Sequence, residues 1–276
     1  MSTATATETA HACNASVIGR EQIHPELIVL RVRPDGKLFD FKPGQFAVLG
    51  LPGSAPRVPE AEIETPAPDP DKLIRRAYSI ASASVERRYC EFYITLINSG
   101  GLTPRLFALK HGSKVFLGPK ASGVFTLDRT PPGKTAVLIA TGTGLAPYVS
   151  MLRTILTTET HRKFVVLHGA RYSWDLGYRG ELETLSRLRP NFTYIPSITR
   201  PDQDQHFLGR IGRIQAILEQ GALDKDAGVP LDPEHADVFL CGNPEMIKVV
   251  TEMLEKKGFK RGDSKNPGNI HVEEYW

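Results

Sequence analysis

The sequence predicts two domains: an antiparallel β-barrel, followed by an α/β domain built on a parallel sheet. The chain has 276 residues, nearly twice the usual length of one domain. Its first half holds short apolar segments separated by turn residues, a pattern typical of small barrels. Its second half alternates apolar strands with helical segments, a pattern typical of parallel sheets. Because the pattern changes at Pro131-Pro132-Gly133, we place the domains at residues 1–131 and 132–276.

The composition is that of a globular protein in water. Hydrophobic residues make up 41% of the chain and charged residues 24%, values that argue against disorder. No apolar run approaches the roughly 18 residues that a membrane-spanning helix needs. The first ten residues carry neither the basic flank nor the apolar block of a secretory signal. We therefore expect a cytoplasmic monomer without a membrane span, frayed over residues 1–14.

Charge and cysteine content exclude several classes of function. The formal net charge is only +3, and basic residues are interleaved with acids, so we expect no nucleic-acid partner. Cys13, Cys90 and Cys241 lie far apart, without the spacing of a zinc site, an iron–sulfur centre or a disulfide framework. We predict no metal site. If this chain moves electrons, the carrier must be an organic cofactor or belong to a partner.

The barrel is predicted from short strands and one long loop. Residues 89–97 alternate apolar and polar side chains, which predicts a strand with one buried face. Residues 52–75 contain six prolines and five acids, so we predict a surface loop there. Residues 102–110 have the apolar spacing of a helix. The other predicted strands are 27–33, 45–51, 77–82 and 113–117.

The second domain is predicted as alternating strands and helices. We expect strands at 135–140, 163–168, 192–198 and 236–241. We expect helices at 146–157, 180–189, 211–219 and 245–257, the last ending at Gly258, a natural C-cap.

A glycine-rich turn joins the first of these strands to its helix. Within the segment Thr141–Pro147, residues 142–147 have the pattern G-x-G-x-x-P, with glycines at Gly142 and Gly144. Glycines allow a backbone to approach a pyrophosphate, and the helix that follows supplies free N–H groups and a positive dipole. The alternative is a tight turn with no ligand. The strand–turn–helix context favours a dinucleotide site.

Arginines follow the next strand ends. Arg171 stands where an NAD-binding sheet carries an acid for the ribose hydroxyl, Arg200 ends the following strand, and Arg210 precedes the next helix. A guanidinium suits a 2′-phosphate through bidentate contacts. Each arginine alone is better explained as a solvated side chain. Together they favour NADP over NAD.

A second set of motifs lies in the barrel. In Arg76-Ala77-Tyr78-Ser79, the guanidinium can hold a phosphate, the aromatic ring can stack on a flat ligand, and the hydroxyl can bind a ring nitrogen. The alternative is an edge strand of mixed polarity. Residues 101–104 begin a helix, and Thr103 can cap it with its hydroxyl. The start of this helix would be a second phosphate-binding site. Two phosphate-binding sites, one in each half, indicate a dinucleotide cofactor and a second nucleotide.

The order of these motifs resembles the ferredoxin–NADP reductase family, most closely the bacterial ferredoxin/flavodoxin reductases. The motifs are R-x-Y-S, G-L-T-P-R, G-T-G-L-A-P, H-G-A-R-Y, C-G-N-P and a terminal E-E-Y-W. The resemblance runs from about Ala15 to Trp276. It implies that the barrel binds FAD, that the α/β domain binds NADP(H), and that electrons pass to or from ferredoxin or flavodoxin. Since the chain has no cluster of its own, the one-electron partner should be a separate protein.

The resemblance also implies a set of site residues. FAD would be bound by Arg76, Ala77, Tyr78, Ser79, Tyr93, Ile94, Thr95, Gly101, Leu102, Thr103, Thr143, Tyr275 and Trp276. NADP would be bound by Thr141, Gly142, Gly144, Arg171, Arg200, Arg210, Cys241, Gly242 and Asn243. The residues next to the reacting atoms would be Tyr78, Ser79, Cys241 and Glu273.

Several alternatives stay open at this point. Cys241 either positions the nicotinamide or simply fills a strand end, and Glu273 either assists proton balance or is solvated. Arg75, Arg87 and Arg88 either steer an acidic carrier protein or form a solvated face. The same chemistry would serve a flavin reductase or an NAD(P)H-fed reductase of an oxygenase. A non-catalytic nucleotide-binding subunit is the remaining reading.

Overall fold

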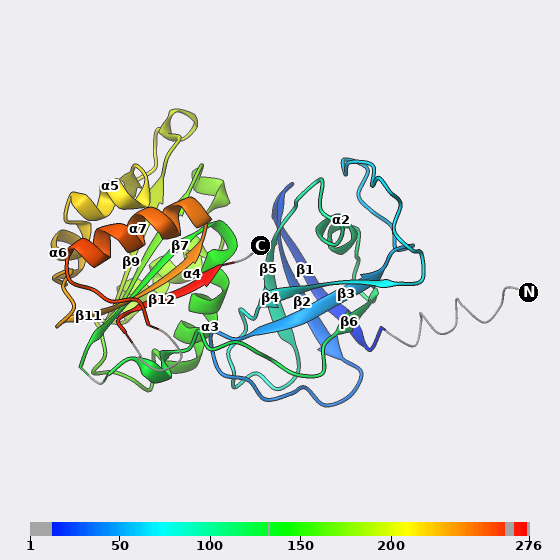
Figure 1. The fold of residues 1–276 in the computed structure, drawn as a ribbon, viewed down its shortest axis with the longest axis horizontal. Coiled ribbons are helices and arrows are strands. Elements are labelled where there is room, and N and C mark those ends of the chain that lie inside the picture. Colours follow the sequence, from blue (N-terminus) through cyan, green and yellow to red (C-terminus); the bar gives the residue numbers. More distant parts are fainter. Residues whose placement is uncertain (1–12, 132, 263–267, 275–276) are drawn as a thin grey trace, which may run out of the picture. The chain divides into compact units, whose positions relative to one another are not determined.

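The computed structural model describes residues 13–131, 133–262 and 268–274, and Figure 1 shows its fold. The chain forms two compact units, Met1–Val124 and Phe125–Trp276. The sequence places the division slightly later, at Pro131. Among the described residues, no helix is both long and apolar enough to cross a membrane.

The first unit is a six-stranded antiparallel sheet. Its strand order is β4-β3-β6-β1-β2-β5. A bridge between Ile80, just after β4, and Phe92 in β5 links the two ends of the sheet, so the sheet closes into the predicted barrel. Apolar side chains from all six strands form one core inside it. The strands are β1 (Ala15–His24), β2 (Leu27–Pro34), β3 (Phe46–Pro52), β4 (Leu73–Ser79), β5 (Cys90–Thr95) and β6 (Lys114–Leu117).

Two predictions about the barrel strands are wrong. Strand β1 was not predicted because its sequence contains many polar residues. It forms an antiparallel hairpin with β2. Strand β5 is buried on both faces, although its alternating sequence predicted one solvated face. Glu91 is only 1% exposed because Arg31 lies opposite it in β2 and donates to its carboxylate from Nε at 2.6 Å. An ion pair therefore accompanies the burial of a polar position on the face of β5 opposite the barrel core.

The helix and the loop of the barrel are shorter than predicted. Helix α2 spans only Thr103–Phe107, and the chain turns at Gly112, whose φ of 83° suits glycine. The two ends of the Pro-rich loop are hydrogen-bonded to each other, because Gly53 N donates to Lys72 O at 3.0 Å and Ser54 N to Pro70 O at 3.0 Å. The last residues of the predicted loop belong to β4.

The second unit is a six-stranded parallel sheet, as predicted. Its order is β10-β9-β8-β7-β11-β12. In β11, Val238 and Leu240 pack with α5 and α7, whereas Phe239 contacts the ring of Phe125, so helices and loops cover both faces. The strands are β7 (Thr135–Thr141), β8 (Phe164–Ala170), β9 (Phe192–Ile198), β10 (Arg210–Ile211), β11 (Ala236–Gly242) and β12 (Ile270–Glu274). The helices are α3 (Ala146–Ile155), α4 (Arg179–Leu188), α5 (Ile214–Glu219), α6 (Ala222–Ala227) and α7 (Pro244–Lys256).

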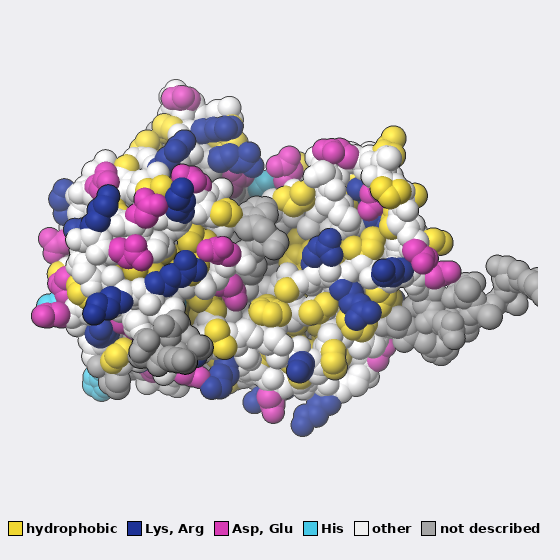
Figure 2. Space-filling model, in the orientation of Figure 1, with side chains coloured by type: hydrophobic (Ala, Val, Ile, Leu, Met, Phe, Trp, Pro, Cys, Tyr) yellow, Lys and Arg dark blue, Asp and Glu magenta, His cyan; other side chains and the backbone are white. Residues whose placement is uncertain are grey.

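The helix predicted at 211–219 is in fact two elements. Arg210 and Ile211 pair with the end of β9 as the short strand β10. Gly212, with a φ of 139°, then breaks the backbone direction before α5 begins at Ile214. Helix α6 was not predicted. Charges on the face of this unit visible in Figure 2 are of mixed sign, with Lys and Arg side chains beside Asp and Glu.

Candidate functional site

The carboxyl ends of β7 and β11 form the centre of the site in the parallel sheet. From β7 the chain adds strands outward through β8, β9 and β10, then returns to the other side of β7 with β11. Such a reversal opens a crevice at the strand ends, and ligands of open α/β sheets bind there. The turn Gly142–Leu145 follows β7 at this edge, and Cys241 and Gly242 end β11 beside it.

The backbone at this crevice has no room for additional side chains. A Cβ placed on Gly144 would lie 2.4 Å from the carbonyl oxygen of Cys241, and one on Gly242 would lie 2.3 Å from Thr141 Oγ1. Gly142 and Gly242 also have positive φ values, 53° and 127°. Glycine is required at these positions by close approach and by conformation. The turn after β7 and the end of β11 therefore pack backbone against backbone, whereas Gly142 has open space on its Cβ side that a dinucleotide backbone can approach.

Two predicted NADP-binding side chains have partners within the protein. Thr141 Oγ1 accepts from Asn243 N at 2.7 Å, which ties the two strand ends together. Asn243 Oδ1 accepts from Glu245 N at 2.9 Å and Met246 N at 3.2 Å, and thus caps helix α7. These side chains fix the shape of the crevice.

Cys241, Glu273 and Tyr148 lie around one strand end. Cys241 is fully buried and stands opposite Glu273 in the pairing of β11 with β12. Tyr148, on α3, is also buried, and its hydroxyl donates to Ile139 O at 3.1 Å. Burial raises the pKa of Tyr148, and the nearby Cys241 and Glu273 raise it further. The phenol therefore stays neutral and packs as a buried side chain near the end of β11.

His168 is the first residue of the H-G-A-R-Y motif, and the motif did not predict a role for it. It lies in the apolar strand β8 and is fully buried. Its Nδ1 is 3.2 Å from Tyr194 Oη, and its Nε2 is 3.3 Å from Gly142 O. Because a carbonyl oxygen only accepts, Nε2 carries the proton and Nδ1 accepts from the tyrosine. Burial lowers the pKa of His168 to about 4, against a smaller opposing effect of the Gly142 carbonyl, so a neutral imidazole supports the glycine-rich turn.

The three predicted arginines lie at neighbouring strand ends. Arg171 follows β8, and its carbonyl accepts from Arg200 N at 2.9 Å, so these two backbones are adjacent. Arg210 pairs with Ser197 near the end of β9. Their side chains have protein partners as well: Arg200 Nη1 donates to Tyr172 Oη at 2.8 Å, and Arg210 forms a two-point ion pair with Asp226.

An aromatic pair stands beside these arginines. The rings of Tyr172 and Trp174 are stacked, with centroids 4.7 Å apart and planes 9° apart. The Arg200 guanidinium lies 5.4 Å from the centroid of the Tyr172 ring. Trp174 is 43% exposed, so part of its indole surface is open to solvent. The sequence reasoning did not identify Trp174.

In the barrel, the R-x-Y-S motif forms the last four residues of strand β4. Arg76 is exposed, and its Nη1 donates to the carbonyl of Arg75 at 2.8 Å. Tyr78 is half-buried against the barrel core, and burial raises the pKa of its phenol. Ala77 is exposed and Ser79 is 4% exposed. The motif therefore presents one exposed guanidinium and one supported aromatic ring in a single strand.

The neighbouring strand β5 contributes buried residues. Tyr93 and Ile94 are buried, and Thr95 is half-buried at the strand end. Thr143, in the other unit, is half-buried in its turn. The predicted residues Tyr275 and Trp276 lie outside the described residues.

The turn before α2 differs from the prediction at Thr103. Its hydroxyl does not cap the helix; Oγ1 instead accepts from Ile97 N at 3.0 Å and donates to Ile97 O at 3.1 Å. The reason is that the chain loops back at Gly100 and Gly101 and brings Thr103 beside the end of the previous segment. Leu102 is buried and anchors the turn in the barrel core.

The same turn is held from the other side by the Pro-rich loop. Arg105, which is 2% exposed, donates to both carboxylate oxygens of Glu64 at 2.8 Å, to Gly101 O at 2.5 Å and to Gly53 O at 2.6 Å. One guanidinium therefore joins the start and the middle of the loop to the turn. The sequence left the role of this loop open.

The arginines proposed to steer a carrier protein are paired at the surface. Arg87 binds Asp40, and Arg88 Nε donates to Glu86 Oε1 at 2.9 Å. Arg75 lies 5.3 Å from the centroid of the Phe116 ring. The positive charges of Arg87 and Arg88 are thus partly balanced locally, which weakens any long-range attraction.

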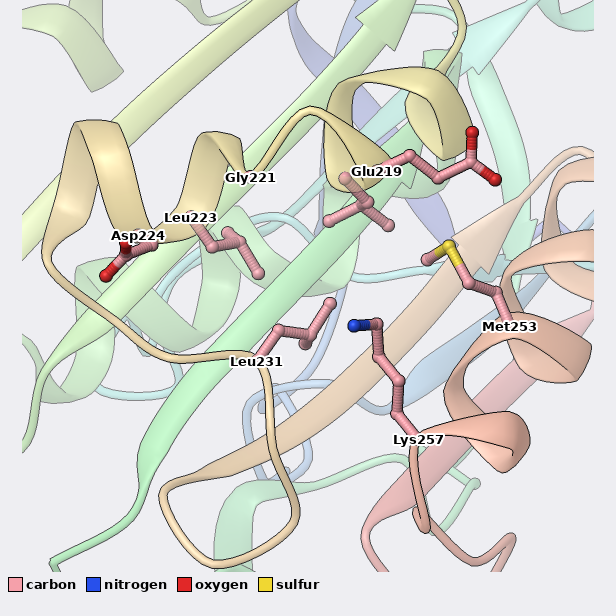
Figure 3. Close-up of a pocket in the computed structure, with 8 residues that line it drawn as sticks. Glu219, Gly221, Leu223, Asp224, Leu231, Met253 and Lys257 are labelled. Atoms are coloured by element: carbon pink, nitrogen blue, oxygen red, sulfur yellow. The ribbon is translucent and has the colours of Figure 1, made fainter.

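A cavity of about 340 Å³ lies away from these strand ends, among helices α5, α6 and α7. Figure 3 shows Lys257 extending its amine toward Leu231, with Met253 on the same side and Asp224 pointing away. Its wall is mainly aliphatic and its rim carries Glu219 and Asp224. It contains none of the residues that the motifs predict.

The parallel sheet defines the class of protein. Its reversal of strand order beside a glycine-rich turn is the construction of a nucleotide-binding α/β domain, here joined in one chain to an antiparallel barrel. In agreement, the family model described as "Oxidoreductase NAD-binding domain" matches residues 138–252.

Individual relatives narrow the class to a family. The chain is 36% identical to ferredoxin–NADP reductase A of Sorangium cellulosum over 244 residues, covering 85% of this chain and 80% of that one. It is 32% identical to flavodoxin/ferredoxin–NADP reductase of Escherichia coli over 237 residues, covering 86% and 88%. The chain belongs to the ferredoxin/flavodoxin–NADP reductase family, and the predicted family is confirmed.

A solved structure supports the fold over the whole length. The ferredoxin NADP+ reductase of Neisseria gonorrhoeae, with bound FAD and NADP, is similar with a TM-score of 0.79 at 26% identity. The match covers 95% of this chain and 98% of that chain. The predicted combination of an antiparallel barrel with a parallel α/β unit is therefore confirmed.

Proposed function

We propose that this protein is an FAD-dependent reductase that transfers electrons between NADP(H) and a ferredoxin or flavodoxin. The observation that carries the proposal is the glycine-rich turn at the switch point of the parallel sheet, where Gly144 and Gly242 let the ends of β7 and β11 pack backbone against backbone. Such a turn, placed at a switch point and before a helix, suits a dinucleotide. The relatives with this architecture are named as reductases that use NADP.

In the barrel, R-x-Y-S suits FAD. When bound, FAD accepts a hydride from NADPH and releases the two electrons one at a time to the protein carrier. The exposed fork of Arg76 can balance the charge of the diphosphate. Tyr78 offers an aromatic face that the barrel core supports, and its raised pKa keeps the phenol protonated as a donor. Ser79 stands next to it in the strand.

In the α/β unit, the strand ends suit NADP(H). Arg171, Arg200 and Arg210 supply the positive charge that distinguishes a 2′-phosphate from a hydroxyl. The fully buried Cys241 lies at the end of β11, where it would define the position of the nicotinamide by shape. Glu273, in β12, is the register partner of Cys241, close enough to influence a proton at that strand end. We also propose that the protein is a cytoplasmic monomer.

An anaerobic titration of the purified protein tests the proposal. We expect a yellow protein whose flavin absorbance is bleached by NADPH, more efficiently than by NADH, and restored by oxidised ferredoxin or flavodoxin. A colourless protein, or a flavin that NADPH does not reduce, would contradict the proposal. Restoration by free flavin but by neither carrier protein would instead favour a flavin reductase.

A further inference from the structure

The ion pair between Arg210 and Asp226 bears directly on which coenzyme the protein prefers. Arg210 Nε donates to Asp226 Oδ2 at 2.8 Å, and Arg210 Nη2 donates to Oδ1. The side chains are 34% and 28% exposed. Hydrogen bonding to Asp226 raises the pKa of the Arg210 guanidinium. One edge of the guanidinium fork is therefore already occupied by a carboxylate.

The two partners come from different elements, and each is held in place. Arg210 belongs to β10, which pairs with the end of β9. Asp226 lies in the last turn of α6, where Ala222 and Leu223 are buried and Gly228 ends the helix in a left-handed conformation. A buried helix face and a paired strand fix both backbones. The carboxylate therefore faces Arg210 because of the fold itself.

The site of this ion pair is the corner where the other two arginines lie. Arg200 N donates to Arg171 O at 2.9 Å, and the next strand along the sheet contains Arg210. The sequence predicted three cations for the 2′-phosphate here. The structure adds an anion to one of them. A phosphate that approaches Arg210 meets a fork with one edge taken and a negative charge beside it.

We propose that Asp226 sets the coenzyme selectivity of this protein by reducing its preference for NADPH over NADH. This inference rests on the proposed function, in which the three arginines receive the 2′-phosphate. That phosphate carries close to two negative charges, so a neighbouring carboxylate repels it. NADH has a neutral hydroxyl at the same position and experiences no such repulsion. Asp226 therefore acts on the difference between the two coenzymes.

The substitution Asp226→Asn isolates the charge. Asparagine keeps the size of the side chain and a carbonyl oxygen that can accept from Arg210 Nη2, so the orientation of the fork is largely retained. Asp224→Asn is the matched control. It makes the same change of charge two positions earlier in α6, where residues do not share a face of the helix, and Figure 3 shows its carboxylate pointing away from Lys257.

Two nucleotides that differ only in the 2′-phosphate give a direct readout without turnover. Adenosine 2′,5′-bisphosphate and AMP are titrated into the holoprotein by calorimetry. We expect Asp226→Asn to bind the bisphosphate about three- to tenfold more tightly at low salt, with AMP affinity changed less than about twofold. The gain should shrink as ionic strength rises. Asp224→Asn should match the wild type.

The outcomes separate the inference from the proposed function. Unchanged or weaker bisphosphate binding in Asp226→Asn overturns the inference, as does an equal gain in Asp224→Asn. Arg210→Ala tests the proposed contact between Arg210 and the 2′-phosphate, and should weaken bisphosphate binding much more than AMP binding. If Arg210→Ala affects both nucleotides equally, the assignment of Arg210 to the 2′-phosphate in the proposed function is wrong. If it affects the bisphosphate alone while Asp226→Asn has no effect, only the role of Asp226 is wrong.

Discussion

Arg105 in the barrel and the pair Arg200 and Arg210 in the α/β unit differ in burial and in the partners they contact, although the residue type is the same. In the barrel, Arg105 is buried and contacts Glu64 together with the carbonyls of Gly53 and Gly101. In the α/β unit, Arg200 and Arg210 stand at strand ends and contact other side chains at the surface. The comparison shows that burial and the type of partner, rather than the residue itself, separate a structural arginine from one available to a ligand.

The physical basis is the cost of removing an ion from water. A buried guanidinium must have its hydrogen bonds satisfied by the protein, and losing a partner leaves an uncompensated charge. An exposed guanidinium keeps its hydration and gives up a surface partner at little cost. Arg105 is therefore committed to the fold. In the proposed function, Arg200 can exchange its contact with Tyr172 for a phosphate at little cost, whereas Arg210 keeps Asp226 beside it.

The largest effect is expected from Arg105→Ala. The substitution leaves Glu64 and two carbonyls without their donor, so we expect the barrel to lose about 2–4 kcal/mol of stability. The thermal midpoint should fall by roughly 10 °C, measured by circular dichroism on the holoprotein. The ratio of NADPH to NADH efficiency should remain that of the wild type. A normal midpoint would show that the contacts to the Pro-rich loop contribute nothing.

The α/β unit also contains a buried histidine, His168, whose contribution to stability should depend on pH. Its folded pKa of about 4 lies below the ordinary value of 6.5, so the unfolded chain takes up the proton first. Its contribution is therefore fully present above pH 6.5 and is lost as the pH falls toward 4, by at most about 1.4 kcal/mol per pH unit.

Comparison with a variant isolates this contribution. The midpoint difference between the wild type and His168→Gln should narrow from pH 7.5 to pH 5. Tyr194→Phe removes the hydroxyl partner but keeps the buried imidazole, so this control should retain the wild-type slope. Parallel curves for the wild type and His168→Gln would refute the depressed pKa.

Arg200→Ala should show the reverse of Arg105→Ala. Because its guanidinium contacts Tyr172 at the surface, we expect stability within about 0.5 kcal/mol of the wild type. We expect kcat/KM to fall about tenfold for NADPH and at most about twofold for NADH. Steady-state rates with ferricyanide as acceptor measure both. A loss of stability with unchanged selectivity would place Arg200 with Arg105 and break the comparison.

Much of the fold and the centre of the site could be predicted from the sequence. Strands β7, β8 and β11 are continuous apolar runs, and each ends in residues that only a turn or a close approach explains, such as Gly144 and Gly242. Local periodicity and glycine placement determine these features. For the same reason the alternation of strand and helix identified the parallel sheet.

The missed features depend on partners distant in sequence. On the face of β5 opposite the core, the buried Glu91 is paired with Arg31 of the neighbouring strand β2. Thr103 binds the backbone of Ile97 because the chain folds back on itself. Asp226 was not singled out, since nothing in its neighbourhood indicates that it faces Arg210. Long-range ion pairs leave no periodic trace in a sequence.

The smallest effect is expected at the surface arginines of the barrel. Arg88 binds Glu86, and Arg87 binds Asp40. Their charges are balanced within a few ångströms, so their field decays faster with distance than that of a free cation. We expect Arg88→Ala to change the KM for an acidic carrier protein by at most about twofold at low salt, in assays with NADPH as donor. Glu86→Gln serves as the control, because it frees the Arg88 cation and should lower that KM instead. A several-fold rise in KM for Arg88→Ala would show that a paired surface arginine can act on a partner as strongly as one at a strand end acts on a nucleotide.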